Sequence, residues 1–407
     1  MSKHVLVTLL GRARQSYEAV RYRFPDGSER ATPFFGLALA DHLQPDRLLI
    51  LGTRASMWDT LVEHLAPDDA DEDLRLRLRL MDASKVGEVD QSLLDAAKPL
   101  LERALKRSVD ARLVGFADTI DEQVSILQAI SEGVGRDDAS IDVTHGFRHL
   151  GMLGLESAFL LGKTRAQARQ GASVRGIWYG ALDMRQGDLV PVLQLDGLLE
   201  LREWVTALAR FDESGNYAVF APLLERDGVD RSVAQCLRDA WFLESNLNLS
   251  AAREKLLAVD RALRGPSMLA GAGALFRPRL LERLSWIKRD NLREWQHNLA
   301  HKALARRDYL RAAIFGTEAV ITHACIERGG APHEKKDRED AKVALQKELP
   351  LDENKDWRSR AFKTLTGVRN AMAHAMPGKD SRLNELLRDE RRLEEEMSRC
   401  LEQLAPP

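Results

Sequence analysis

The sequence is poor in cysteine and contains no long hydrophobic run. Its three cysteines, Cys236, Cys325 and Cys400, are far apart among 407 residues, which argues against a disulfide framework and fits no paired zinc-binding arrangement. No apolar run reaches the roughly 18–20 residues that a membrane-spanning helix needs. The opening MSKHVLVTLLGR turns polar too soon for a signal peptide and is expected to form a β-strand. We therefore expect a cytoplasmic protein with no membrane partner.

The sequence also lacks an excess of charge of either sign. Sixty Lys and Arg stand against 62 Asp and Glu, which gives a net charge of −2. Any anionic ligand must therefore be bound by local clusters of basic residues. The loop after the first expected strand lacks G-x-G-x-x-G, and G-x-x-x-x-G-K-[ST] is absent. Both absences disfavour a nucleotide-metabolising Rossmann enzyme and the common type of NTPase.

The first 195 residues alternate between strand and helix patterns. Such alternation predicts an α/β domain with a mostly parallel, Rossmann-like sheet covered on both faces. The last two strands, separated by residues 183–188, are expected to form an antiparallel hairpin at one edge. Residues 74–81 (LRLRLRLM) alternate strictly between Leu and Arg, a pattern typical of a strand with one wet face. The expected strands are 4–10, 47–52, 74–81, 111–116, 140–144, 174–182 and 189–195.

From residue 196 onward the pattern is that of an all-α protein. Long amphipathic stretches replace the β-branched runs, among them 279–305, 309–328, 356–375 and 382–404. A chain of this length is expected to hold two or three domains. We predict a ligand-sensing domain over 1–195, a helical linking region over 196–270 and a helical domain over 271–407.

Three loops of the first domain carry residues suited to a phosphate-bearing ligand. In an open parallel sheet, ligands bind beyond the carboxyl ends of the strands, where loops and helix N-termini meet. The loops offer hydroxyl groups, backbone amides and several guanidinium groups, which bind phosphate well. Each of them, taken alone, is equally compatible with an ordinary solvated loop. The candidate ligand-binding residues are Gly11, Arg12, Arg14, Thr53, Arg54, Asp142, Thr144, His145, Gly146, Phe147 and Arg148.

The helical half contains the hexapeptide RNAMAH, at Arg369–His374. An Arg and a His five positions apart converge only near a helix end or a kink, and Pro377 indicates such an end. His374 could transfer a proton to or from the ribose oxygens of RNA, and Arg369 could stabilise charge on the phosphorane. Asn370 could hold the His tautomer or a phosphate oxygen. A surface Arg beside a partly buried His is the plainer alternative.

A second histidine pair, His297 and His301 in HNLAH, shares one helix face at a spacing of four residues. A zinc site of the H-E-x-x-H type would need the intervening Glu, which is missing, and further ligands. We therefore expect a polar helix face here and no metal site.

The chain as a whole resembles the CARF–HEPN ribonucleases, the stand-alone effectors of type III CRISPR systems. The likeness depends on three features in one order. A short strand with a Gly11-Arg12 loop opens the chain, residues 142–148 (DVTHGFR) look like the D-[IV]-T-H-G-x-R signature of the sensor domain, and R-N-x-x-x-H at 369–374 stands near the end as in the nuclease domain. The segment 198–211 is also similar to the linking helix of this family.

The resemblance implies a function that composition alone does not reveal. It implies a CARF sensor that binds cyclic oligoadenylate, with cyclic tetra-adenylate as the expected activator, and a HEPN domain that cleaves single-stranded RNA without a metal or cofactor. The implied catalytic residues are Arg369, Asn370 and His374. It also implies a homodimer, because a ring with two-fold symmetry is matched by two copies of the same loops.

Two further functions remain compatible with the sequence. The chain could be a ligand-sensing interaction protein whose helical domain is catalytically inactive. A sensor fused to a DNA-binding regulator is less compatible, since no helical stretch has the one-sided basic face of a recognition helix.

Overall fold

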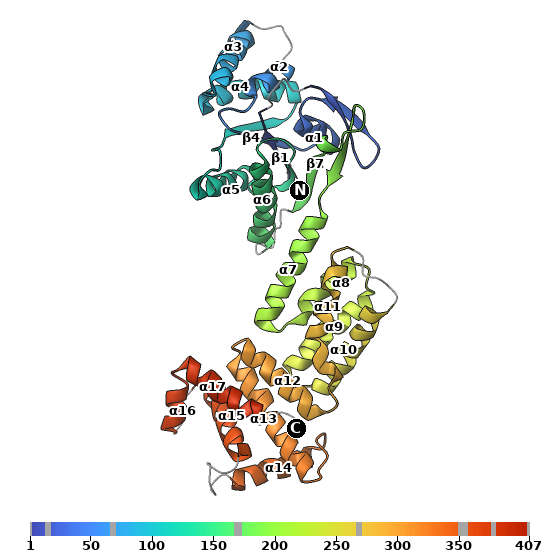
Figure 1. Ribbon diagram of the computed structural model, residues 1–407, viewed down its shortest axis with the longest axis vertical. Helices are drawn as coiled ribbons and strands as arrows, with labels where there is room; N and C mark the ends of the chain where they lie inside the picture. The colour runs from blue at the N-terminus through green and yellow to red at the C-terminus, as the bar shows by residue number, and fades with distance from the viewer. Residues whose placement is uncertain are drawn as a thin grey trace. The chain divides into compact units, whose positions relative to one another are not determined.

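The structure is a computed structural model, and it divides into two compact units, Met1–Leu199 and Glu200–Pro407. Figure 1 shows the first unit in blue to green and the second in yellow-green to red. The described residues are 2–12, 18–65, 71–166, 173–265, 271–348, 357–375 and 380–404. An α/β unit is followed by an all-helical one, which confirms the expected fold class.

An eight-stranded sheet forms the centre of the first unit, with the strand order β3-β2-β8-β7-β6-β1-β4-β5. The five strands from β7 to β5 are parallel, whereas β8 runs antiparallel to β7. The strands are β1 (His4–Leu10), β2 (Val20–Arg23), β3 (Glu29–Thr32), β4 (Arg47–Gly52), β5 (Ser108–Leu113), β6 (Asp138–Asp142), β7 (Val174–Gly180) and β8 (Leu189–Gln194).

Helices cover both faces of this sheet, so the unit has three layers. Alternate residues of β1 point in opposite directions: Leu6 packs with α1 to α4, while Val7 packs with α5 and α6. Two separate buried clusters result, as expected for a parallel sheet with two covered faces. The helices are α1 (Phe35–Leu43), α2 (Trp58–Leu65), α3 (Asp71–Val86), α4 (Gln91–Leu105), α5 (Ile120–Val134) and α6 (Arg148–Ala166).

Residues 74–81, expected to be a strand, belong to helix α3 instead. Neither Leu nor Arg is branched at Cβ and both have high helix propensity, so a Leu-Arg alternation suits a helix as well as a strand. Leu76 and Leu80 are one helical turn apart and pack toward the core, whereas Leu78 is half exposed. Packing of one helix face against the core therefore outweighs the local alternation of Leu and Arg.

The expected hairpin forms, but it does not lie at the edge of the sheet. β2 and β3, which the sequence patterns did not reveal, extend the sheet beyond β8, and Arg21 in β2 is in parallel register with Leu189. Each of these strands has only four residues, too few to show a clear alternation. The expected strands 111–116 and 140–144 both begin earlier in the structure, at Ser108 and Asp138.

The second unit is built around one continuous buried cluster that extends from Trp204 to Leu404. Helices before residue 265, which we expected to form a separate linking region, share this cluster with the later helices. α13 is at its centre and packs against α12, α14, α15 and α17. The helices are α7 (Gly197–Ser214), α8 (Ala221–Arg226), α9 (Arg231–Ser245), α10 (Leu249–Arg264), α11 (Gly273–Arg283), α12 (Leu292–Ala305), α13 (Tyr309–Glu327), α14 (Lys335–Glu348), α15 (Trp357–His374), α16 (Ser381–Leu386) and α17 (Glu390–Glu402).

Two stretches that we expected to be single helices are interrupted. Residues 279–305 are divided between α11, a 3₁₀ turn at Ser285–Lys288 and α12, where Asn291 caps the new helix by accepting from Glu294 N. Residues 382–404 are divided between α16 and α17, where Asp389 provides the equivalent cap by accepting from Arg392 N. A side-chain cap satisfies backbone N–H groups that would otherwise lack partners, which makes a fresh helix start favourable.

Candidate functional site

The three candidate ligand loops follow neighbouring strands in the middle of the sheet. β1 lies between β6 and β4 and is parallel to both, with Leu10 in register with Gly52 and Val7 in register with Ile141. The carboxyl ends of these strands therefore meet at one edge, where α2 and α6 begin. The structure thus brings the loops together as the sequence predicts. Arg14 lies outside the described residues.

The loops after β1 and β4 are bound tightly to each other. Met57 N donates to Gly11 O at 3.1 Å, and Ser56 Oγ donates to Leu10 O at 2.7 Å. Ser56 Oγ also accepts from Thr53 N at 2.9 Å, and Thr53 is buried. The Thr53 hydroxyl lies 3.3 Å from Ser56 Oγ, so it belongs to this internal network and does not face a ligand.

Asp142 ends β6 as a fully buried carboxyl group. It accepts hydrogen bonds from Thr8 Oγ1 at 2.6 Å and from Thr144 N at 2.8 Å. Burial raises the pKa of Asp142 to about 6, although these hydrogen bonds oppose the shift. Asp142 therefore fixes the start of the loop, and its side chain is not available to a ligand.

His145 also points inward. Its Nε2 accepts from Phe35 N at 3.0 Å, which satisfies an amide at the start of α1. Burial lowers the pKa of His145 to about 4, so the ring is neutral near pH 7. Thr144 Oγ1 similarly accepts from Gly180 N at 2.8 Å, and Gly146 adopts a φ of +92°, which suits glycine. In the structure His145 and Thr144 hold the loop against α1 and β7, and the assignment of this loop to the ligand stays a prediction.

Three arginines remain available at this edge of the sheet. Arg12, Arg54 and Arg148 are all exposed, and none forms an ion pair or hydrogen bond with the part of the chain that the structure describes. Arg148 begins α6, where the helix dipole also favours an anion. Guanidinium groups without internal partners can bind phosphate oxygens through two parallel hydrogen bonds.

Aromatic rings beside these arginines were only partly anticipated by the sequence. Phe147 is 45% exposed and stacks on His149, with ring centroids 5.6 Å apart. Phe116 lies 6.1 Å from Phe147, and His149 Nε2 is 2.7 Å from Phe116 O. Phe116 and Arg54 also line a cavity of about 500 Å³. Exposed rings next to guanidinium groups can stack with planar bases, so this edge suits a ligand with both phosphates and bases.

The sequence signal that could have revealed Phe116 was a large aromatic residue shortly after the end of a strand. It was overlooked because we placed Phe116 inside the strand 111–116, whereas β5 ends at Leu113. Residues beyond the last strand residue lie in the ligand-binding loop region of a parallel sheet.

The second candidate site lies at the end of α15. Arg369 Nε and Nη2 both donate to Asn370 Oδ1, at 3.2 and 3.0 Å. His374 is the last residue of α15 and is exposed, and Ala375 turns the chain with a φ of +49°. The described residues provide no hydrogen-bond partner for His374.

Arg369 and His374 do not converge within one chain. The helix continues regularly to His374, and five residues at about 100° each place the two side chains roughly 140° apart around its axis. Asn370 therefore orients Arg369, and the described residues show no hydrogen bond between Asn370 and His374. A site that uses both Arg369 and His374 needs a second α15.

His297 and His301 contact each other, with Nε2 atoms 3.1 Å apart and ring centroids at 4.5 Å. His297 Nε2 is also 2.8 Å from Leu401 O, and burial lowers the pKa of both rings. No cluster of three or more His, Cys, Asp or Glu suited to a metal ion occurs among the described residues. Within the same residues, no helix is both long and apolar enough to cross a membrane.

Comparisons with known proteins agree with the sequence resemblance. Residues 5–183 match the family model described as CRISPR system endoribonuclease Csx1, CARF domain. CRISPR-associated protein MJ1674 of Methanocaldococcus jannaschii is 24% identical over 396 residues, which cover 89% of this chain and 59% of the relative. The chain thus spans less than two thirds of that curated relative. The resemblance to the CARF domains of CRISPR systems is confirmed for residues 5–183.

A solved structure is similar over the whole chain at low identity. Enterococcus italicus Csm6 bound to cyclic hexa-2'-fluoro-hexa-dAMP matches 100% of this chain and 95% of its own, with 11% identity and a TM-score of 0.37. The family model ends at residue 183, so the candidate residues of α15 lie outside it.

Proposed function

We propose that this chain, whose residues 5–183 match the Csx1 CARF-domain model, is a ribonuclease switched on by cyclic oligoadenylate. In this proposal the first unit binds the activator, with cyclic tetra-adenylate as the preferred ring. The second unit cleaves single-stranded RNA as a homodimer, without a metal ion. The observation that carries the proposal is the group of three arginines, at the carboxyl edge of the sheet, that have no ion pair or hydrogen bond with the described residues.

The sensor edge has the chemistry of a cyclic oligonucleotide. Arg12, Arg54 and Arg148 supply charge-assisted hydrogen bonds to phosphates, and Phe116 and Phe147 supply faces for adenine. A ring with two-fold symmetry presents each of its halves to one copy of these loops. Two chains would thus surround one activator with six guanidinium groups, which fits a ligand with several phosphates.

The end of α15 has the groups for metal-independent RNA cleavage. The 2′-hydroxyl attacks the adjacent phosphorus and gives its proton to a neutral His374, while the bond from phosphorus to the 5′-oxygen breaks. A protonated His374 from the other chain gives its proton to that leaving oxygen. Arg369, held by Asn370, stabilises the charge on the phosphorane. The products are a 2′,3′-cyclic phosphate and a 5′-hydroxyl.

The deciding experiment is RNA cleavage measured against cyclic oligoadenylates of several ring sizes, in the presence of EDTA. We expect cleavage only with a cyclic activator, strongest with the tetra-adenylate, and products ending in 2′,3′-cyclic phosphate. Cleavage that requires a divalent metal would overturn the proposed chemistry. Stronger activation by a ring of another size would change the identity of the activator but not the proposed RNA cleavage.

A non-catalytic interaction protein is the second candidate. The separation of Arg369 from His374 in the single chain is the observation that favours it. Binding of a cyclic oligoadenylate with no RNA cleavage by the dimer at any ring size would establish this alternative.

A further inference from the structure

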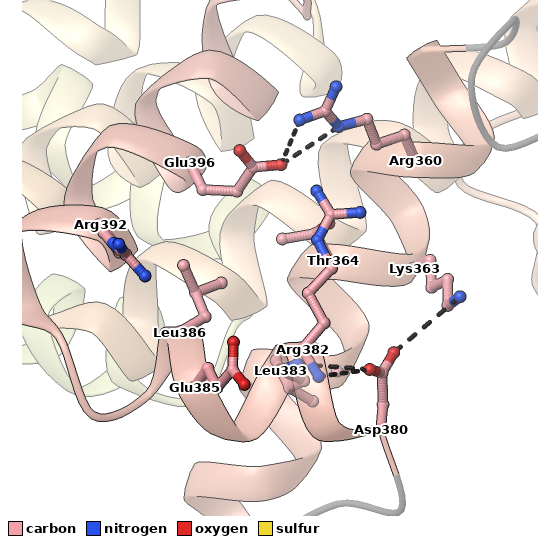
Figure 2. Close-up of a pocket in the computed structure, with 11 residues that line it drawn as sticks. Arg360, Lys363, Thr364, Asp380, Arg382, Leu383, Glu385, Leu386, Arg392 and Glu396 are labelled. Atoms are coloured by element: carbon pink, nitrogen blue, oxygen red, sulfur yellow. Dashed lines mark hydrogen bonds and ion pairs between the residues drawn. The ribbon is translucent and has the colours of Figure 1, made fainter.

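A cavity of about 590 Å³ lies between α15, α16 and α17 in the second unit (Figure 2). Its volume is within the range of sites that hold small organic ligands. α15 contributes Arg360, Lys363, Thr364 and Gly367, all on one helix face, and α16 contributes Arg382 and Glu385. The cavity is thus a built feature of three packed helices, with charged groups on its walls.

Most of these charges neutralise one another. Arg360 donates to Glu396 Oε1 through Nε at 3.1 Å and through Nη2 at 2.7 Å. Lys363 Nζ lies 4.0 Å from Asp380 Oδ2, and Arg392 Nε lies 3.3 Å from Asp389 Oδ2. These pairs leave little net charge for an anionic ligand.

Arg382 is the exception. Only its backbone N–H bonds to Asp380, and its guanidinium group forms no hydrogen bond or ion pair within the described part of the chain. Figure 2 shows the side chain extending from α16 into the space beside Thr364. Glu385, one turn further along, likewise presents a carboxylate without a partner among the described residues. Among the described residues, the cavity wall thus has one cation, Arg382, and one carboxylate, Glu385, that have no partner.

The same face of α15 leads to the candidate catalytic histidine. Gly367 lines the cavity, and His374 follows seven residues later, two turns on and on the same face. At about 1.5 Å of rise per residue, the two positions are roughly 10 Å apart along the helix. A strand bound at His374 can therefore place a neighbouring nucleotide in the cavity.

We propose that this cavity is a subsite for one nucleotide of the single-stranded RNA substrate, next to the nucleotide that is cleaved. Arg382 binds its phosphate, and Glu385 accepts a hydrogen bond from the ribose 2′-hydroxyl or from a base amino group. This inference rests on the proposed function, because it takes RNA as the substrate of the α15 site. It assigns substrate binding to a surface outside the R-N-x-x-x-H segment.

The test separates binding from cleavage. A fluorescent single-stranded oligoribonucleotide is titrated into full-length His374→Ala protein, which holds the RNA intact, with and without Arg382→Glu. We expect Arg382→Glu to weaken RNA binding by roughly tenfold or more, since charge-assisted hydrogen bonds are the strong ones. The slope of log K against log salt should also become shallower by about 0.7, the value for one lost phosphate contact on a single strand.

Arg391→Glu is the matched control, because it reverses another exposed charge, on α17. Arg391 pairs with Glu395 and is not part of the cavity wall. Arg382→Lys keeps the charge without the forked geometry and should recover part of the affinity. In active protein, Arg382→Glu should raise KM for RNA far more than it lowers kcat.

The outcomes are distinct. Equal RNA affinity and equal salt slopes for Arg382→Glu and Arg391→Glu would overturn the subsite. If Arg382→Glu weakens binding of a DNA strand of the same sequence as much as it weakens binding of the RNA, Glu385 does not bind the 2′-hydroxyl. Absence of cleavage by wild type with every activator would refute the proposed function alone, because the binding titration does not depend on cleavage.

Discussion

At the scale of single residues, Asp142 and His145 are neighbours in one loop whose protonation responds in opposite directions. Burial raises the pKa of Asp142 from 3.8 to about 6 and lowers that of His145 from 6.5 to about 4. The stability that protonated Asp142 contributes is present below about pH 4 and is lost as the pH rises through 6. The stability that neutral His145 contributes is present above about pH 6.5 and is lost as the pH falls toward 4. The two effects oppose each other in the same window.

Replacing Asp142 removes its pH-dependent contribution to stability and leaves that of His145. Asp142→Asn should become more stable relative to wild type as the pH rises from about 4 to about 7, by up to about 3 kcal/mol, because each pKa unit corresponds to about 1.4 kcal/mol. Urea denaturation of both proteins at several pH values measures the difference. Asp138→Asn is the control on the same strand: although burial opposes it, hydrogen bonds from Ser173 and Arg175 lower the pKa of Asp138 to about 2. The difference in unfolding free energy between Asp138→Asn and wild type should stay constant between about pH 4 and about pH 7. If the difference in unfolding free energy between Asp142→Asn and wild type does not change with pH, the raised pKa of Asp142 is contradicted.

The residues at the end of α15 should differ in how severely their loss affects cleavage. His374→Ala should lower kcat by about 10²–10⁴-fold, the usual contribution of a general acid or base. Asn370→Ala should lower it by only about tenfold, because Arg369 remains but loses the Oδ1 atom that orients it. Asn370→Asp keeps an acceptor oxygen and should restore most of the rate. His301→Ala is the control, and a larger effect from His301 than from His374 would move the site to α12.

At the scale of elements, the sequence predicts the strands better than their arrangement. β1 and β4 are short apolar runs that end at or just before a Gly, and both were predicted with the bounds that the structure has. Nothing in the sequence states that β1 lies between β6 and β4, and this order is what brings the three loops together. The Leu-Arg alternation in α3 is compatible with both the period of a strand and the period of a helix. Only the packing of Leu76 and Leu80 against the core favours the helix.

The candidate site was predictable in position but not in the direction of its side chains. Thr144, His145 and Asp142 look like ligand groups in the sequence, yet each bonds to the protein itself. Their partners, Gly180, Phe35 and Thr8, come from three other elements, so their direction depends on tertiary contacts. Arg54 and Arg148 kept their predicted exposure because long charged side chains favour solvent when no partner is near.

The loops of the sensor should therefore be tested through their arginines. Arg148→Ala should weaken binding of the cyclic oligoadenylate by roughly 10–100-fold, which corresponds to the ~1.5–3 kcal/mol of a charge-assisted hydrogen bond. The concentration of activator needed for half-maximal cleavage should rise by a similar factor, while the rate at saturation stays unchanged. Arg30→Ala, in β3 at the far edge of the sheet, is the control. Calorimetry and activation curves that match wild type for both Arg148→Ala and Arg54→Ala would refute the sensor edge.

At the scale of the whole molecule, the proposed function needs two chains. One α15 cannot bring Arg369 and His374 together, and one sensor edge matches only half of a symmetric ring. The first unit has an apolar surface suited to such pairing. Large exposed hydrophobic side chains gather at the N-terminal ends of α5 and α6, where Ile120 is 77% and Met152 70% exposed, with Val124 and Phe147 about half exposed. α5 packs against α6, and we expect these residues to share one face of the unit.

This face should be the contact between the two chains. Met152→Glu places a charge where an apolar contact excludes water, and an unpaired buried charge is strongly unfavourable. We expect this variant to sediment as a monomer at concentrations where wild type is a dimer, and to cleave RNA far more slowly at low protein concentration. Raising the protein concentration should restore part of the activity, because dissociation is reversible by mass action. Val86→Glu, at an equally exposed apolar position on α3, is the control and should remain a dimer. A monomer that still cuts RNA at the wild-type rate would show that one chain is sufficient, and Arg369 and His374 would then have to act with other groups of their own chain.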